Sequence, residues 1–142
     1  MQIFRRPAEK DVRRLLSAAT LPVDDLTPAH LEDFFGCGAP DAPQGVGGIE
    51  IHGHDALLRS LAVDAQARGR GCGTALVAAL EAHAREHGVR RVYLLTTTAA
   101  RFFEGLGYRV VARDDAPASI RATEEFAALC PAGAAFMAKA LD

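Results

Sequence analysis

Three closely spaced glycines are the residues of this chain with the clearest chemical potential. They stand in the run RGRGCG at 68–73, between a predicted strand over 56–63 and a predicted helix over 74–87. The first turn of a helix carries unpaired backbone N–H groups and about half a unit of positive charge. Glycines let such a backbone approach a phosphate closely. The run therefore predicts a pyrophosphate site, and a tight turn that holds no ligand is the alternative.

Two familiar phosphate-binding patterns do not fit this run. The dinucleotide fingerprint would require a glycine at the position of Thr74. The P-loop requires a Lys-Ser or Lys-Thr pair after its last glycine, but Thr74 and Ala75 follow Gly73. A regulator that binds ATP or a dinucleotide is a further alternative, but neither pattern supports it.

The elements that must position the glycine run alternate between strands and helices. Periodic apolar residues indicate the helices, and runs of β-branched or aromatic residues indicate the strands. Strands are expected over 3–6, 46–51, 56–63, 91–96, 108–112 and 134–140. Helices are expected over 8–20, 28–34, 74–87, 99–106 and 119–129. Residues 36–44 are expected to form a loop and residues 52–55 a hairpin turn, so the class is a mixed α/β sheet.

The composition is that of an ordinary globular protein. The chain has 142 residues, of which 49% are hydrophobic and 24% charged, enough for one domain with its own core. No apolar run approaches the roughly 18 residues of a membrane span, and the N-terminus lacks a secretory signal. We therefore expect a cytoplasmic protein with no membrane partner. The net charge of −2 argues against nucleic acid as a partner.

The three cysteines, Cys37, Cys72 and Cys130, contain no CxxC pair. An odd number without that spacing indicates reduced thiols rather than a disulfide framework or a zinc site. We therefore expect no metal.

Two blocks of sequence resemble the GNAT superfamily of N-acetyltransferases. The first is LAV at 61–63 followed by R-x-x-G-x-G at 68–73, and the second is AARFFEGLGY at 99–108. The resemblance implies one domain over residues 1–142, with a mostly antiparallel central sheet of about six to seven strands flanked by helices. It implies acetyl-CoA as the cofactor. Stretches at 57–63, 93–98 and 120–131 further resemble a GNAT subgroup associated with arsenic-resistance operons.

The resemblance also implies a mechanism in which an amine attacks the thioester directly. The N–H of Leu61 or Ala62 would then stabilise the oxyanion, and Leu61 would count as a catalytic residue. Backbone groups of 61–63 would bind the pantetheine arm, and amides of 69–74 the pyrophosphate. The implied cofactor-binding residues are Leu61, Ala62, Val63, Arg68, Gly69, Arg70, Gly71, Cys72, Gly73, Thr74, Phe102 and Phe103.

The general base that we expect is Glu50. It lies on the strand predicted to pair with 56–63, close to where the amine would arrive, and a solvated glutamate is the alternative. His52 and His54 have suitable pKa values for the same role, but residues of these types also serve as ordinary turn residues.

The general acid departs from the family pattern. Phe103 stands where many GNAT members carry a tyrosine that protonates the leaving thiolate, and phenylalanine has no proton to donate. A thiolate with a pKa near ~8.5 leaves without such help. Tyr108, Ser60 and Thr98 are the other candidate donors.

The acceptor site is expected around Arg59, which lies two residues before Leu61 and so should share its face of the strand. Arg59 would bind an acceptor carboxylate in bidentate fashion, with Thr97 and Arg121 nearby. Pairing of Arg59 with an acidic side chain of the chain itself is the alternative.

The expected function is acetylation of a small, amino-acid-like amine, and a non-catalytic acyl-CoA-binding sensor is the alternative. A homodimer through an uncovered C-terminal strand is also expected.

Overall fold

The computed structural model describes residues 2–129 and 133–142 and contains one seven-stranded sheet. The strand order is β1-β2-β3-β4-β5-β7-β6, and every neighbouring pair is antiparallel except β4 and β5. The expected mixed, mostly antiparallel sheet of six to seven strands is therefore confirmed. Cys130 and Pro131 lie outside the described residues. The strands are β1 (Ile3–Arg5), β2 (Phe34–Ala39), β3 (Ala42–His52), β4 (Asp55–Val63), β5 (Arg91–Thr96), β6 (Arg109–Val110) and β7 (Ala135–Ala140).

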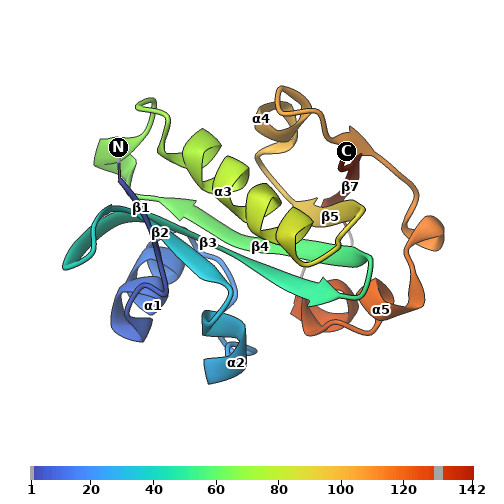
Figure 1. The fold of residues 1–142 in the computed structure, drawn as a ribbon, viewed down its shortest axis with the longest axis horizontal. Coiled ribbons are helices and arrows are strands. Elements are labelled where there is room, and N and C mark those ends of the chain that lie inside the picture. The colour runs from blue at the N-terminus through green and yellow to red at the C-terminus, as the bar shows by residue number, and fades with distance from the viewer. Residues whose placement is uncertain (1, 130–132) are drawn as a thin grey trace.

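Helices cover both faces of the sheet (Figure 1). The α-helices are α1 (Glu9–Ala18), α2 (Pro28–Leu31), α3 (Cys72–Glu86), α4 (Ala100–Glu104) and α5 (Ala118–Arg121). The described residues also form the 3₁₀ helices η1 (Ala65–Ala67) and η2 (Arg113–Asp115) and the π-helix η3 (Glu125–Leu129). Every helix within 2–129 and 133–142 is too short or too polar to span a membrane.

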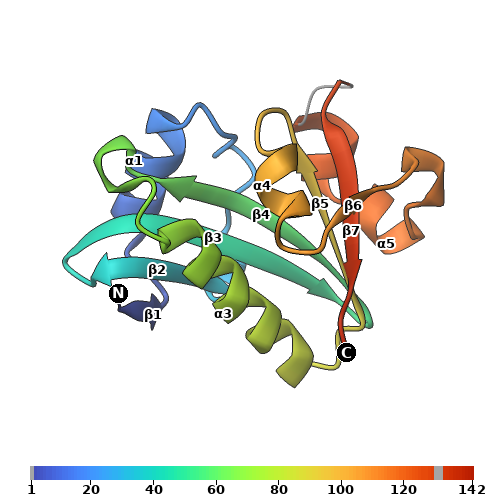
Figure 2. The same cartoon turned by 90° about the horizontal axis from the view of Figure 1, so that it is seen from above.

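The core is divided between the two faces. On the face covered by α3 and α4, Leu76 and Leu80 belong to the same buried cluster as Ile49 and Leu58 of the sheet. On the other face, α1 packs against Phe34, Val46 and Ala62, and α5 contributes Ile120 to a cluster with Leu57 and Phe136. The sheet thus separates an α3 face from an α1/α5 face, which Figures 1 and 2 both show.

The loop expected over 36–44 is wrong, because these residues form a hairpin of β2 and β3. The glycines and prolines fit this ladder. Gly38 has φ of 106° next to a bulge after Cys37, a conformation that glycine adopts without strain. Pro43 precedes Gly45, where the β3–β4 register begins, so its missing N–H costs that ladder nothing.

Two expected helices are shorter than predicted. The segment from Pro28 is helical only to Leu31, with Thr27 and His30 forming a capping box, and Phe34 already belongs to β2. The helix expected over 119–129 is broken after Arg121. The Thr123 hydroxyl donates to the Ile120 carbonyl at 2.7 Å and accepts from the Phe126 N–H at 3.3 Å, so a side chain competes with the helical backbone there.

A bulge in β4 reverses the expected orientation of its second half. The register passes from Gly48–Arg59 to Val46–Ala62, so Ser60 and Leu61 together oppose one residue of β3. Ser60 has φ of 58°. Arg59 consequently shares the α1/α5 face with Ala62, whereas Leu61 packs into the α3-face cluster. The expectation that Arg59 and Leu61 share a face is wrong, because the extra residue shifts the side-chain alternation by one position.

Strands β4 and β5 separate soon after they meet. Their parallel pairing is confined to Asp55–Arg91, Ala56–Val92 and Leu57–Tyr93. Beyond Leu57 the two strands diverge, as Figure 2 shows. Within the part of the chain that the structure describes, the edge of β4 facing β5 therefore has no strand partner from residue 58 onward. The sheet is therefore split at its centre.

The C-terminal strand is not an uncovered edge. β7 pairs with β5 along its length and with β6 at Met137 and Ala138. The edge strands are β1 and the two-residue β6. The expected reason for dimerisation through β7 is therefore wrong, because β6 returns along its outer side.

Candidate active site

The glycine run forms an open turn at the start of α3. Gly71 is the N-cap residue, with φ of 87° and no side-chain hydrogen bond to the helix, and Gly69 has φ of 79°. A Cβ at either glycine would meet nothing within 4 Å. The backbone N–H groups of the first helical turn have no intrahelical acceptor. They therefore lie next to a stretch of glycine backbone that a ligand can approach. This is the geometry that an anion requires.

The side chains of the turn differ in their positions. Arg68 and Arg70 are exposed, and Arg68 Nε donates to the Val63 carbonyl at 3.4 Å. Cys72 is buried, and burial is the main cause that raises the pKa of its thiol to about 12. Cys72 is therefore a neutral packing residue beneath the turn, while the two arginines remain available to a phosphate.

Helix α4 closes one side of the turn. A Cβ at Gly73 would lie 3.2 Å from Phe102 Cζ, so only glycine allows this close approach without displacement. Phe102 is 37% exposed, while Phe103 is buried against Phe102 and Tyr108. The structure thus brings Phe102 to the turn and places Phe103 in the core beside it.

The free edge of β4 begins close to the turn. Only Asp64, η1 and residues of the glycine run separate Val63 from Gly71 along the chain. Leu61 and Val63 are partly buried on the α3 face, and Ala62 is buried on the other. Because Ser60 and Leu61 lie outside the β3 register and residues 58–63 have no β5 partner, this edge offers unpaired backbone groups to an extended ligand.

The alternative proton donors are differently engaged. The Tyr108 hydroxyl is buried and donates to Glu81 Oε2 at 2.9 Å, and burial is the largest cause that raises its pKa. Lys139 Nζ donates to the same carboxylate at 3.0 and 3.1 Å. Ser60 Oγ accepts from Arg59 Nε at 3.0 Å. Thr98 is exposed after the end of β5.

A buried group of charges lies on the α1/α5 face of β4. We call Asp25, Glu50, Arg59 and Glu125 the Arg59 cluster. Arg59 has a fully buried side chain and donates to both Asp25 oxygens, one at 2.7 Å, and to Glu50 Oε2 at 2.8 Å. Glu125 Oε2 lies 3.7 Å from Arg59 Nη2. The expected carboxylate clamp is thus occupied by the chain's own carboxylates, which was the alternative interpretation.

The pKa shifts follow from this packing. Burial works to raise the pKa of Asp25, but the hydrogen bond and charge of Arg59 outweigh it, and that pKa is lowered. Burial is the main cause that raises the pKa of Glu125, against the attraction of Arg59. Burial would lower the pKa of Arg59, but the hydrogen bond that Arg59 donates to Asp25 and the charge of Glu125 raise it. Arg59 therefore stays charged, and its attraction does not offset the effect of burial on Glu125.

A pocket of about 360 Å³ opens beside the cluster. Glu50 has a 9% exposed side chain and lies between two histidines, with Oε1 3.4 Å from His52 Nε2 and Oε2 3.8 Å from His30 Nε2. We call this space the acidic pocket. It is lined by Asp25, His30, Glu50, His52, Ser119, Ala122, Thr123 and Glu124.

Three residues expected near the acceptor are not brought to this pocket. Thr97 is exposed after β5. Arg121 directs its guanidinium to the carbonyls of Asp114 and Ala116, the latter at 3.1 Å. His54 Nδ1 lies 3.1 Å from the Gly88 carbonyl, which joins the hairpin turn to the end of α3.

Three residues of the site were missed in the sequence. Asp25 and His30 come from the loop before α2 and from α2 itself, and Glu125 begins η3. None stands in a motif, and their shared target, Arg59, is far from each of them in sequence. The one signal in the sequence was the alternative interpretation of Arg59, in which it pairs with an acidic side chain of the chain itself.

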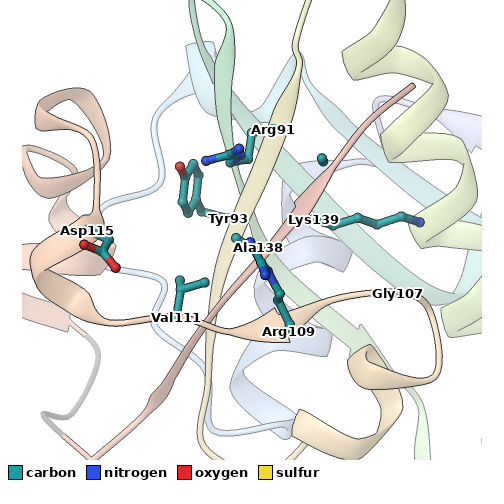
Figure 3. A pocket seen from close by; sticks show the side chains of 9 residues that line it. Arg91, Tyr93, Gly107, Arg109, Val111, Asp115, Ala138 and Lys139 are labelled. Carbon is teal, nitrogen blue, oxygen red and sulfur yellow. The ribbon is translucent and has the colours of Figure 1, made fainter.

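A second hollow of about 310 Å³ lies at the other edge of the sheet, around β5, β7 and β6 (Figure 3). Tyr93 and Asp115 lie on one side of β7, whereas Lys139 points to the opposite side, toward α3. This hollow contains none of the predicted site residues, and its charged side chains do not converge.

Comparison with known proteins identifies the family. The model of the acetyltransferase (GNAT) domain matches residues 32–110, which include the β4 bulge, the glycine turn and α4. The chain belongs to the GNAT acetyltransferase family. The resemblance found in the two sequence blocks is thereby confirmed at the level of the family.

Solved GNAT structures share the fold over nearly all of this chain. N-acetylglutamate synthase of Neisseria gonorrhoeae, solved with coenzyme A and N-acetyl-glutamate, superposes with a TM-score of 0.84 at 19% identity, over 99% of this chain and 35% of that one. Rv2747 of Mycobacterium tuberculosis, solved in complex with CoA, gives 0.79 at 22% identity over the full length of both. The mouse (Mus musculus) N-alpha-acetyltransferase 80 is 40% identical over 57 residues, which are 40% of this chain and 18% of that protein.

Proposed function

We propose that this chain is an N-acetyltransferase that moves the acetyl group of acetyl-CoA to the amine of a small molecule. The observation that carries the proposal is the uncapped N-terminus of α3 beside the free, bulged edge of β4. The GNAT neighbours solved with coenzyme A support it. The proposal takes residues 1–142 as one catalytic domain. The cytoplasmic location and the arsenic-resistance subgroup rest on the sequence and remain part of the proposal.

Acetyl-CoA is proposed to bind along a line from the turn to the bulge. Backbone N–H groups of 69–74 bind the diphosphate, with Arg68 and Arg70 adding charge. The pantetheine arm then follows the free edge of 61–63, and Phe102 borders the site. The thioester reaches the bulge, where the N–H of Leu61 or Ala62 stabilises the oxyanion.

The reaction is proposed to be a direct attack by the neutral amine. The amine nitrogen bonds to the thioester carbon, the C–S bond then breaks, and the amine loses one proton. Glu50 is the proposed base, because it lines the acidic pocket within 3.4 Å of His52. The thiolate departs without a tyrosine at position 103, as a thiol with a pKa near ~8.5 allows.

A thiol-release assay tests the proposal directly. Acetyl-CoA and a panel of small amines should give continuous release of coenzyme A that depends on both the amine and the protein. A thermal-shift comparison of acetyl-CoA with ATP and NAD should show stabilisation by acetyl-CoA alone. Stabilisation by ATP or NAD without an effect of acetyl-CoA would overturn the cofactor assignment.

A non-catalytic acyl-CoA sensor is the second candidate, and Phe103 favours it. The hydroxyl of Tyr108 is bound to Glu81, so it does not replace the missing tyrosine. Turnover and the variant Glu50→Gln separate the two candidates. An enzyme should release coenzyme A, and Glu50→Gln should reduce its kcat/KM about tenfold or more with coenzyme A affinity retained. A sensor would bind coenzyme A but release none from acetyl-CoA with any amine.

A further inference from the structure

We propose that the acceptor is a cationic amine, which carries a second positive charge besides the nitrogen that reacts and which binds in the acidic pocket. The inference deepens the proposed function and rests on it for the reaction. It replaces the amino-acid-like acceptor, whose expected carboxylate partner was Arg59. That guanidinium is fully buried and already contacts three carboxylates.

The wall of the acidic pocket is negative. Asp25, Glu50 and Glu124 contribute carboxylates to it, and among the described residues no lysine or arginine lines it. His30 and His52 are its other titratable groups, and each adds positive charge only when protonated. A ligand carboxylate would therefore meet repulsion at this wall, and an ammonium would meet attraction.

The charge behind the wall does not balance. Arg59 is one cation, and Asp25, Glu50 and Glu125 all face it. Glu125 is only 7% exposed, and its Oε2 accepts no hydrogen bond from any residue that the structure describes. A buried carboxylate oxygen without a donor is costly. The cluster therefore holds an excess of negative charge, which a bound cation would compensate.

The acidic pocket is linked to the proposed reaction centre through Arg59, which contacts Asp25 and Glu50 of the pocket wall. Arg59 directly precedes the bulge residue Ser60 and donates to its hydroxyl at 3.0 Å. Glu50 pairs with Leu57, the last residue of β4 that is paired with β5. A volume of about 360 Å³ is at the small end of the range for ligand sites. It suits a short aliphatic chain, with one amine toward the bulge and the other charge against the acidic wall.

Three amines with four carbon atoms each test the inference. The probes are 1,4-diaminobutane, 1-aminobutane and 4-aminobutanoate, which end in an ammonium, a methyl group and a carboxylate. With acetyl-CoA, kcat/KM should fall in that order, by about tenfold at each step. Equal values, or a preference for 4-aminobutanoate, would overturn the inference while leaving the acetyltransferase proposal intact.

Binding separates a failed inference from a failed function. Calorimetric titration of the same amines into the protein with free coenzyme A needs no turnover. Tighter binding of 1,4-diaminobutane would support the cationic site even if no amine were acetylated, in which case only the proposed function would fail. Binding of all three amines with equal affinity, or of none, would overturn the inference.

A variant of the pocket wall gives the second test. Glu124 is exposed and lines the pocket, so Glu124→Gln should fold normally. It should reduce the preference for 1,4-diaminobutane over 1-aminobutane at least threefold. The matched control is Glu86→Gln, an exposed position in the last turn of α3, which should keep the full preference. An unchanged preference in Glu124→Gln would contradict the assignment of the charge to this wall.

Discussion

Arg59 shows how one residue serves structure where the sequence indicated substrate binding. Its guanidinium joins the loop before α2, through Asp25, to β3 and η3 through Glu50 and Glu125. Such a buried ion pair is costly to break because a charge would remain without a partner. Arg59 thus positions Glu50 and the pocket wall, and its guanidinium is occupied by the chain's own carboxylates.

Glu125 should destabilise the fold when it is ionised. Because burial raises its pKa above the ordinary value of 4.5, the folded state binds more protons than the unfolded state between 4.5 and the raised pKa. The free energy of unfolding should therefore decrease as the pH rises through that window and stay lower above it. In Glu125→Gln this decrease should be absent, and the variant should be more stable than the wild type at pH 7 by about 1 kcal/mol.

Denaturant unfolding at pH 4 to 8 measures this difference. Glu124→Gln is the neighbouring control, and its exposed side chain should leave the pH profile unchanged. A Glu125→Gln variant that loses stability at pH 7 would show that the ionised carboxylate is needed by Arg59.

Tyr108 should contribute to stability and not to the proton transfer. Tyr108→Phe removes the bond to Glu81, which keeps Lys139 as a partner. The variant should lose about 1.5 to 2 kcal/mol of unfolding free energy and keep kcat within about twofold, with the same pH profile. A fall in kcat of tenfold or more with a shifted pH profile would instead identify Tyr108 as the acid.

At the scale of elements, the bulge in β4 explains the geometry of the site. It frees Ser60 and Leu61 from the β3 ladder and reverses the faces of the residues after it. The positive φ of Ser60 costs roughly 1 kcal/mol or more in a non-glycine residue, and the bond from Arg59 helps to hold it.

Substitutions at Ser60 should follow its backbone conformation. Ser60→Gly loses the bond from Arg59 but relieves the strain, so its stability should lie within about 0.5 kcal/mol of the wild type. Ser60→Ala should cost about 1 kcal/mol, and Ser60→Val about 2 to 3 kcal/mol because a β-branched residue resists positive φ. Thermal and denaturant unfolding would rank the three, and a Val variant as stable as the wild type would contradict the strained bulge.

Sequence patterns predicted the elements whose signals are local. The expected strand at 91–96, the hairpin turn near Gly53 and the helix that ends before Gly88 are all present, because each depends on nearby residues. The bulge could not be predicted, since serine carries no signal for positive φ. The hairpin at 36–44 was missed because glycine and proline suit both a loop and a bulged strand end.

At the scale of the whole molecule, the sheet order separates the two proposed substrate sites. β4 lies at the centre of the sheet, with α3 and the glycine turn on one face and the acidic pocket on the other. Between these two faces, β4 and β5 diverge beyond Leu57 (Figure 2). The fold class and the approximate number of strands could be predicted from the sequence. The position of β7 between β5 and β6 could not, because strand order depends on long-range pairing.

The affinity for coenzyme A of two matched glycine variants tests the central claim most directly. Gly71 and Gly88 lie at opposite ends of α3, both have positive φ, and neither has an atom within 4 Å of an added Cβ. In Gly71→Asp the carboxylate would repel the diphosphate and occupy the same backbone amides, so calorimetry should show binding at least tenfold weaker. Gly88→Asp should keep the wild-type affinity within about twofold. Equal and unaltered affinity in both variants would contradict the account.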